Sequence, residues 1–159
     1  MPLRLMVVLT CAALLVVAFG MHVASTEYKK TQTKLPTTTV TIGPVVVLVE
    51  VASTDIARQQ GLSGRTSLKE GSGMLFAFDT DWEWGIWMKD MHFPIDIIWT
   101  DQDGTVVTVA KDVSPDTYPQ AFYPSVQARY VLEVPAGFVA VHDVAEGSRL
   151  SIENANAPR

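Results

Sequence analysis

The sequence of 159 residues contains 48% hydrophobic and 18% charged residues, which fits one globular domain with a short appendage and excludes a second full domain. Its formal net charge is −5, and its lysines and arginines are scattered. Because such a surface repels phosphate backbones, we expect no nucleic-acid partner. The single cysteine, Cys11, lies in an apolar segment near the start of the chain, so we expect neither a disulfide nor a thiolate site in the domain.

Residues 1–24 have the pattern of an export segment. Arg4 precedes an apolar run from residue 5 to residue 19, and small residues follow it. These features predict a signal peptide or an N-terminal membrane anchor, without deciding between cleavage and anchoring. We therefore expect an extracytoplasmic protein, periplasmic or at the cell surface, that contacts the membrane only through this segment.

Residues 25–39 are polar, rich in Thr and Lys, and contain Pro36, which predicts a linker. The β-rich domain is predicted over residues 40–154, with a tail at 155–159. Valines at alternating positions predict its first strand over residues 45–51. Further short apolar runs bounded by Gly, Pro or Asp predict strands over residues 74–78, 84–88, 95–99, 105–111, 130–134 and 149–153.

Helical signals are few and short. Ser or Thr at positions 53–54 can cap a helix over residues 55–60, which Gly61 ends. Residues 101–104 are typical of a hairpin turn, and residues 138–142 predict one helical turn. Short strands with little helix predict a mainly β fold, an antiparallel β-sandwich or jelly-roll-like barrel with one or two short helices.

The most varied side chains of the chain gather over residues 87–96, which read Trp-Met-Lys-Asp-Met-His-Phe-Pro-Ile-Asp. The sequence nevertheless contains no GxSxG, HExxH, CxxC, GxxxxGK or GxGxxG pattern. We therefore predict no catalytic residue, and the sequence is more typical of a binding protein than of an enzyme.

Three cations suggest where a ligand would bind. Arg58 and Arg65 flank the predicted helix end, and Lys89 precedes the proline turn. Because guanidinium groups bind carboxylate or phosphate well, the three could form an anion-binding pocket. Alternatively, both arginines pair with Asp96 or Glu133 inside the domain. The predicted ligand-binding residues are Arg58, Arg65, Met74, Trp87, Lys89, Pro94 and Asp96.

A metal site is not expected. His92 and His142 are the only imidazoles within the predicted domain. Met88, His92 and Asp96 are four residues apart, but Pro94 prevents the continuous helix that would bring them to one face. Zinc sites usually use more nitrogen ligands than these. We therefore predict no metal and no cofactor.

Four tryptophans could form a platform for a sugar or a peptide, because each offers a large apolar face and one donor. Trp87 and Trp99 lie in predicted strands, so we expect them in the core. Trp82 and Trp84 stand beside acidic residues, which favours exposure.

Several of these motifs also recur in a known family. The chain resembles the bacterial and archaeal family known as domain of unknown function 192, over roughly residues 45–152. The resemblance implies a compact jelly-roll-type β fold, often exported or tethered, with no established reaction, substrate or cofactor. The family usually has Asn-Thr at positions 90–91 and an aliphatic residue at position 92, where this chain has Asp-Met and His. The motifs that carry the resemblance are Arg58-x-x-Gly61-Leu62-x-x-Arg65, Gly73-Met74-Leu75-Phe76-x-Phe78, Trp87-Met88-Lys89-x-x-x-x-Pro94-Ile95-Asp96, Asp103-Gly104, Val131-Leu132-Glu133-x-x-x-Gly137 and Gly147.

Three hypotheses about function follow. The leading hypothesis is an exported or tethered β-domain that binds a small ligand or an envelope protein. A second is a hydrolase or isomerase that uses Asp96 or Glu133 as a base beside Lys89, which requires a carboxylate with a raised pKa in a cleft. A third is a purely structural envelope protein without a pocket.

Overall fold

Strands dominate the computed structural model, which describes residues 34–153. The predicted export segment, most of the predicted linker and the residues from 154 onward lie outside this range. The elements, in chain order, are β1 (Thr37–Ile42), β2 (Val45–Ala52), α2 (Asp55–Gln60), β3 (Ser72–Trp82), β4 (Ile86–Trp87), β5 (Ile95–Thr100), β6 (Val106–Val113), the 3-10 helix η1 (Pro115–Thr117), β7 (Ala121–Phe122), β8 (Ala128–Pro135), α3 (Phe138–Val141) and β9 (Leu150–Ile152).

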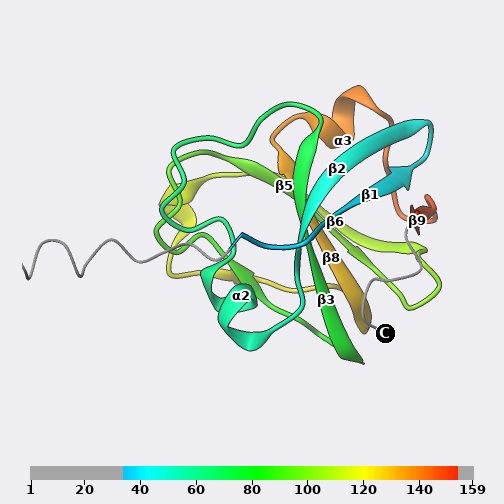
Figure 1. The fold of residues 1–159 in the computed structure, drawn as a ribbon, viewed down its shortest axis with the longest axis horizontal. Helices are drawn as coiled ribbons and strands as arrows, with labels where there is room; N and C mark the ends of the chain where they lie inside the picture. Colours follow the sequence, from blue (N-terminus) through cyan, green and yellow to red (C-terminus); the bar gives the residue numbers. More distant parts are fainter. Residues whose placement is uncertain (1–33, 154–159) are drawn as a thin grey trace, which may run out of the picture. The chain divides into compact units, whose positions relative to one another are not determined.

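Seven strands pair into one sheet in the order β6-β5-β8-β3-β2-β1-β9, while β4 and β7 form a separate two-stranded ribbon. Strands β2 and β3 run parallel, because α2 and the loop after it return the chain to the end of the sheet at which β2 begins. The mainly β fold with two short α-helices is confirmed, whereas purely antiparallel pairing was wrong for this pair. The finer expectation of a sandwich or jelly roll is not confirmed, since the pairings give one curled sheet (Figure 1).

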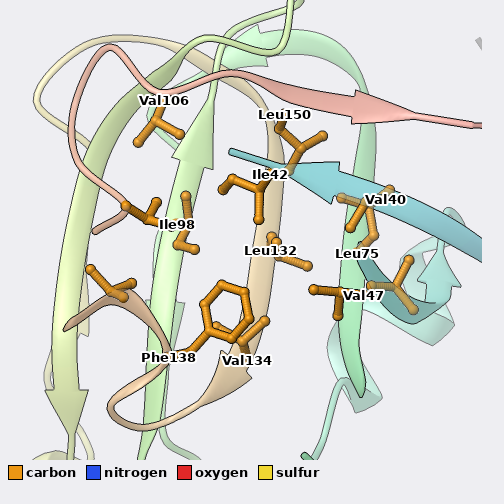
Figure 2. Packing of buried hydrophobic residues seen from close by; sticks show 13 residues of the cluster. Val40, Ile42, Val47, Leu75, Ile98, Val106, Leu132, Val134, Phe138 and Leu150 are labelled. Carbon is orange, nitrogen blue, oxygen red and sulfur yellow. The ribbon is translucent and has the colours of Figure 1, made fainter. Parts of the chain in front are cut away.

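One face of the curled sheet encloses an apolar core. Alternation along the strands places Val47 and Val49 of β2 inside, while Val46 and Leu48 point outward. Figure 2 shows side chains from β1, β3, β5, β8 and α3 meeting in this core. Its buried members are Val40, Ile42, Val47, Val49, Leu75, Ile98, Val106, Leu132, Val134, Phe138, Val139, Val144 and Leu150.

A second core lies on the opposite face of the central strands. Along β8, Leu132 and Val134 belong to the first core, so Val131 and Glu133 point to the second. The loop after α2 and the segment after β4 contribute residues such as Leu62 and Met91 to this core. Glu133 is therefore a carboxyl group placed on an apolar face, and the candidate site is built around it.

The first strand begins at Thr37, so residues 37–39 belong to the sheet rather than to the predicted linker. Thr38 is buried, and Thr37 lies opposite Glu50 of β2 in the antiparallel register. A run of threonines resembles a linker in composition, yet β-branched threonine suits a paired strand.

Local signals in the sequence agree with the short elements. The Thr54 hydroxyl accepts a hydrogen bond from the backbone N–H of Ala57, which caps α2, and Gly61 ends the helix. The predicted turn over residues 101–104 joins β5 to β6. Within the described range, no helix has the length and apolar character needed to cross a membrane.

Candidate functional site

A pocket of about 210 Å³ lies on the second face of the sheet. Its wall is supplied by α2 and the loop that follows it, by β3, by the segment around β4, and by β8. The lining residues are Arg58, Gln59, Gln60, Gly61, Leu62, Ser63, Phe76, Phe78, Trp84, Gly85, Ile86, Trp87, Met91 and Glu133.

Glu133 is the carboxyl group of this pocket. It lies opposite Met74 of β3 and Ile97 of β5, so its strand neighbours are apolar. Only 5% of the residue is exposed, and its Oε2 has no hydrogen-bond partner among residues 34–153. Burial raises the pKa of Glu133 from an ordinary 4.5 to about 8, although the charge of Arg65 opposes this rise. Near neutral pH the group is therefore mostly protonated.

Arg65 is already committed to another carboxylate. Its Nη1 and Nη2 donate to the two oxygens of Glu50 at 2.7 and 2.8 Å, a forked ion pair between the loop after α2 and β2. The hydrogen bonds from Arg65 lower the pKa of Glu50, against the opposing effect of burial. Arg65 therefore acts on Glu133 through its charge, while its hydrogen bonds go to Glu50.

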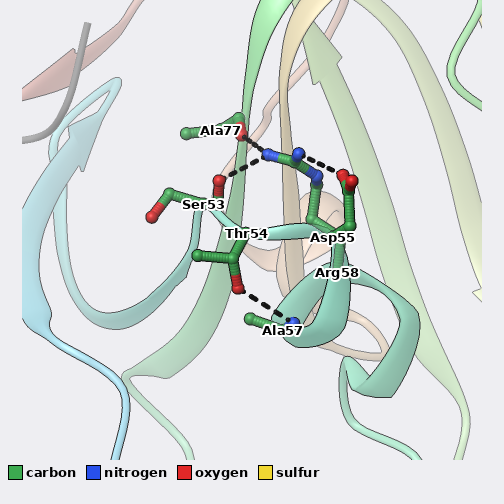
Figure 3. Close-up of polar contacts among 6 residues, drawn as sticks. All are labelled: Ser53, Thr54, Asp55, Ala57, Arg58 and Ala77. Carbon is green, nitrogen blue, oxygen red and sulfur yellow. Dashed lines mark hydrogen bonds and ion pairs between the residues drawn. The ribbon is translucent and has the colours of Figure 1, made fainter.

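Arg58 fastens α2 to β3 at the edge of the pocket (Figure 3). Its Nη1 donates to the backbone oxygens of Ser53 and Ala77, both at 2.7 Å, and its Nη2 pairs with Asp55 at 2.6 Å. The guanidinium carbon also lies 5.1 Å from the ring centre of Phe78. Arg58 thus has a structural role that uses both terminal nitrogens.

Aromatic rings form one wall of the pocket. The Phe78 and Trp84 rings are stacked, with centres 4.0 Å apart and planes 7° from parallel. Trp87 is 50% exposed, and its ring meets Tyr118 edge to face with centres 6.0 Å apart. Both tryptophans border an open pocket and can therefore contact a molecule that enters it.

Residues 38–152 match the sequence profile of the family DUF192, which is described as "Uncharacterized ACR". The chain belongs to the DUF192 family. Two solved structures are similar to it. A "putative transcription regulator" from Sinorhizobium meliloti 1021 shares 27% identity at a TM-score of 0.71, covering 76% of this chain and 97% of that one. A "protein of unknown function" from Novosphingobium aromaticivorans DSM 12444 shares 25% identity at a TM-score of 0.72. This match covers 76% of this chain and 89% of that one. No curated protein matches this chain.

Of the predicted ligand-binding residues, Arg58 and Trp87 line the pocket of this DUF192 domain. Met74 is fully buried in the second core. Lys89 and Pro94 are exposed, and the Nζ of Lys89 lies 3.9 Å from the Oδ2 of Asp90. Of the three predicted cations, Arg58 alone lines the pocket, and each of the three lies beside a different carboxylate.

Asp96 lies on the first face of the sheet, away from Glu133. It is fully buried, and its two oxygens accept hydrogen bonds from the backbone N–H groups of Asp112 and Val139 at 2.7 and 2.8 Å. The predicted pairing of Asp96 with an arginine was therefore wrong. A buried carboxylate can be satisfied by backbone donors as well as by a cation.

The placement of the tryptophans was predicted with mixed success. Trp99 is buried as expected, with its ring N–H donating to the Trp84 oxygen, and Trp82 is 60% exposed as expected. Trp87 was expected in the core and that was wrong, because β4 has only two residues and belongs to the separate ribbon. Trp84 is half-buried against Phe78.

Sequence reasoning did not single out the amide and hydroxyl groups of Gln59, Gln60 and Ser63, which line the pocket. Such residues are common on exposed helix ends, so nothing in their pattern marks them. Glu133 did carry a signal. It is a lone charged residue within the apolar run of residues 131–134, and charged residues are seldom buried without a partner.

Proposed function

We propose that this DUF192 domain binds a small organic ligand in the pocket that Glu133 and the aromatic wall form. The observation that carries the proposal is the buried Oε2 of Glu133, which has no hydrogen-bond partner in the described part of the chain. Burying a polar atom without a partner costs free energy, and a bound polar group would supply the missing hydrogen bond. Mostly apolar pockets with a few polar groups are typical ligand sites.

The charges favour this proposal over the anion pocket considered from the sequence. Arg58 and Arg65 each form an ion pair within the domain, with Asp55 and Glu50. An anionic ligand would have to displace these carboxylates or bind beside Glu133. The ligand we propose therefore has an apolar body and one polar group that reaches Glu133.

NMR titration with a mixture of small aromatic fragments tests the proposal. Fragments should shift the backbone resonances of residues 58–63 and 84–87, and Trp87→Ala should weaken these shifts. Trp82→Ala is the matched control, since Trp82 is also exposed but does not line the pocket. If no fragment perturbs these residues, or if both variants behave alike, the proposal is wrong and a purely structural role is favoured.

A second candidate is catalysis of proton transfer by Glu133, the isomerase-type alternative. The raised pKa of Glu133, at about 8, favours it, because a group that titrates near the working pH is suited to acid–base work. The partners named for it from the sequence do not support it, since Lys89 does not line the pocket and Asp96 bonds to the backbone. Exchange of an acidic C–H of a pocket-binding aryl ketone in D2O, compared between the parent and Glu133→Gln, tests this candidate.

The description of the Sinorhizobium meliloti protein as a transcription regulator does not change the proposal. A net charge of −5 is unfavourable for contact with a phosphate backbone. A regulatory role of this chain would more readily use ligand binding than DNA binding. Titration with duplex DNA at low salt, where binding is strongest, checks this.

We also propose that the domain acts outside the cytoplasmic membrane, where it binds a small ligand or an envelope protein. The proposal rests on the apolar run at residues 5–19 and the polar stretch that follows it. A reporter fused after Arg159, active only in an exported compartment, tests this location. Activity of only a cytoplasmic reporter would contradict it.

A further inference from the structure

Among residues 34–153, the charges around the pocket leave one acidic group without a partner. On α2, Arg58 pairs with Asp55, and in the following loop Arg65 pairs with Glu50 of β2. Each pair is neutral. Beneath them, Glu133 has apolar neighbours on both adjacent strands, Met74 of β3 and Ile97 of β5. When Glu133 is ionised, the site therefore carries one surplus negative charge.

The wall of the pocket suits a positive charge. Trp84 and Trp87 present aromatic rings, whose faces attract cations, and Met91 adds a polarisable sulfur, while the Phe78 ring is already covered by Trp84 and Arg58. The lining contains no lysine or histidine, and its one arginine already has partners for both terminal nitrogens. A free cation is therefore missing from a site that has both a carboxyl group and aromatic faces.

We propose, on the basis of the proposed function, that the ligand is a small organic ammonium ion. Its nitrogen would lie at the Glu133 carboxylate and its apolar body against Trp84 and Trp87. The ammonium N–H groups would donate to the Oε2 that lacks a partner. The volume of about 210 Å³ admits an ion of roughly the size of an arylalkylamine. The acidic net charge of the protein would attract such an ion from a distance.

Binding of this ion is coupled to loss of a proton. Burial holds Glu133 protonated below about pH 8, and an ammonium ion favours the carboxylate, so the carboxyl proton leaves to the solvent as the ion enters. The other charged groups around it are the pairs Arg65–Glu50 and Arg58–Asp55, with Lys89 and Asp90 exposed further away. The forked pair lowers the pKa of Glu50 and raises the pKa of Arg65, so neither of these two groups titrates between pH 6 and pH 8. The affinity for the ion should therefore fall about tenfold from pH 7 to pH 6.

Three probes of similar shape test the proposal on the unaltered protein: 2-phenylethylammonium, 2-phenylethanol and 3-phenylpropionate. Calorimetric and NMR titrations at pH 6, 7 and 8 measure their dissociation constants. We expect the ammonium ion to bind at least tenfold more tightly than the alcohol at pH 8, and the carboxylate to bind most weakly. The affinity of the alcohol should not change with pH. Calorimetry in buffers of different ionisation enthalpy should detect release of close to one proton per ammonium ion bound at pH 6 and about half a proton at pH 8.

The outcomes separate this inference from the proposed function. If the alcohol or the carboxylate binds at least as well as the ammonium ion, the pocket binds ligands but the cationic class is wrong. If none of the three perturbs the pocket residues, both proposals fail. In Glu133→Gln the preference for the ammonium ion should disappear while the alcohol still binds. Because the comparison of probes uses the parent protein, the result does not depend on the folding of this variant.

Discussion

The Oδ2 atom of Asp96 accepts a hydrogen bond from the backbone N–H of Val139 at 2.8 Å, although the two residues are 43 positions apart. The Oδ1 atom accepts from the backbone N–H of Asp112 at 2.7 Å. One buried side chain on β5 therefore holds the start of α3 on one side and the end of β6 on the other. Asp96 closes the fold around the first core, while Glu133 faces the pocket on the opposite side of the sheet.

Asp96→Ala should destabilise the domain by about 3–5 kcal/mol, because it leaves the buried N–H of Val139 and the partly buried N–H of Asp112 without the charged acceptor that they have now. Urea unfolding measures the change. Asp79→Ala is the control, since Asp79 is exposed, and its effect should stay within about 0.5 kcal/mol. Equal stability of the two variants would contradict the role assigned to Asp96.

Gly104→Ala and Gly147→Ala form a matched pair at positive φ, +81° and +89°. In both variants the strain of this backbone region destabilises the folded state by about 1–2 kcal/mol. A methyl group at Gly104 would also lie 2.0 Å from the backbone oxygen of Leu150 and disturb the hydrogen bond from the Leu150 N–H to the Gly104 oxygen, whereas the space beside Gly147 is open. Gly104→Ala should therefore lower the melting temperature clearly more than Gly147→Ala. The reverse order would mean that β9 does not close against the turn as described.

Glu133→Gln should become more stable relative to the parent as pH rises from 5 to 8. The folded pKa of about 8 exceeds the ordinary 4.5, so between these values the folded state holds a proton that the unfolded state has released. The free energy of unfolding of the parent then falls with rising pH, by up to about 1.4 kcal/mol per unit from this group. The stabilisation that protonated Glu133 gives the folded state is fully present below pH 4.5 and is lost above about pH 8. Urea unfolding of both proteins at four pH values tests this, and parallel pH profiles would contradict it.

Arg65→Gln should raise the pKa of Glu133 further, because the charge of Arg65 lowers it in the parent. Glu50→Gln should do the opposite, since it removes a negative charge and leaves the charge of Arg65 without its partner. Carboxyl carbon NMR of Glu133 across pH 5–10 measures both shifts. Shifts of the same sign in the two variants would show that Arg65 does not act through its charge.

Local features of the chain could be predicted from the sequence because their physical causes are local. Thr54 and Gly61 bound α2 as expected, since capping needs only nearby backbone groups. The alternation at residues 45–51 marked β2 and its inner valines. Thr37 was assigned to the linker because β1 begins with a run of threonines, which has no apolar alternation to mark it.

The sequence by itself determined most of the strands, the two short helices, the cap of α2, the turn after β5, and the family, but not β1 or β7. The tertiary structure decided which groups meet across the sheet. It paired Arg65 with Glu50, placed two backbone donors at Asp96 and set β2 parallel to β3. It also placed Glu133 in a pocket with an aromatic wall, where its Oε2 has no hydrogen-bond partner among the described residues. The reason is physical: a cap or a turn depends on residues a few positions apart, whereas the partner of a buried charge depends on strand order and register, which bring together residues far apart in the chain.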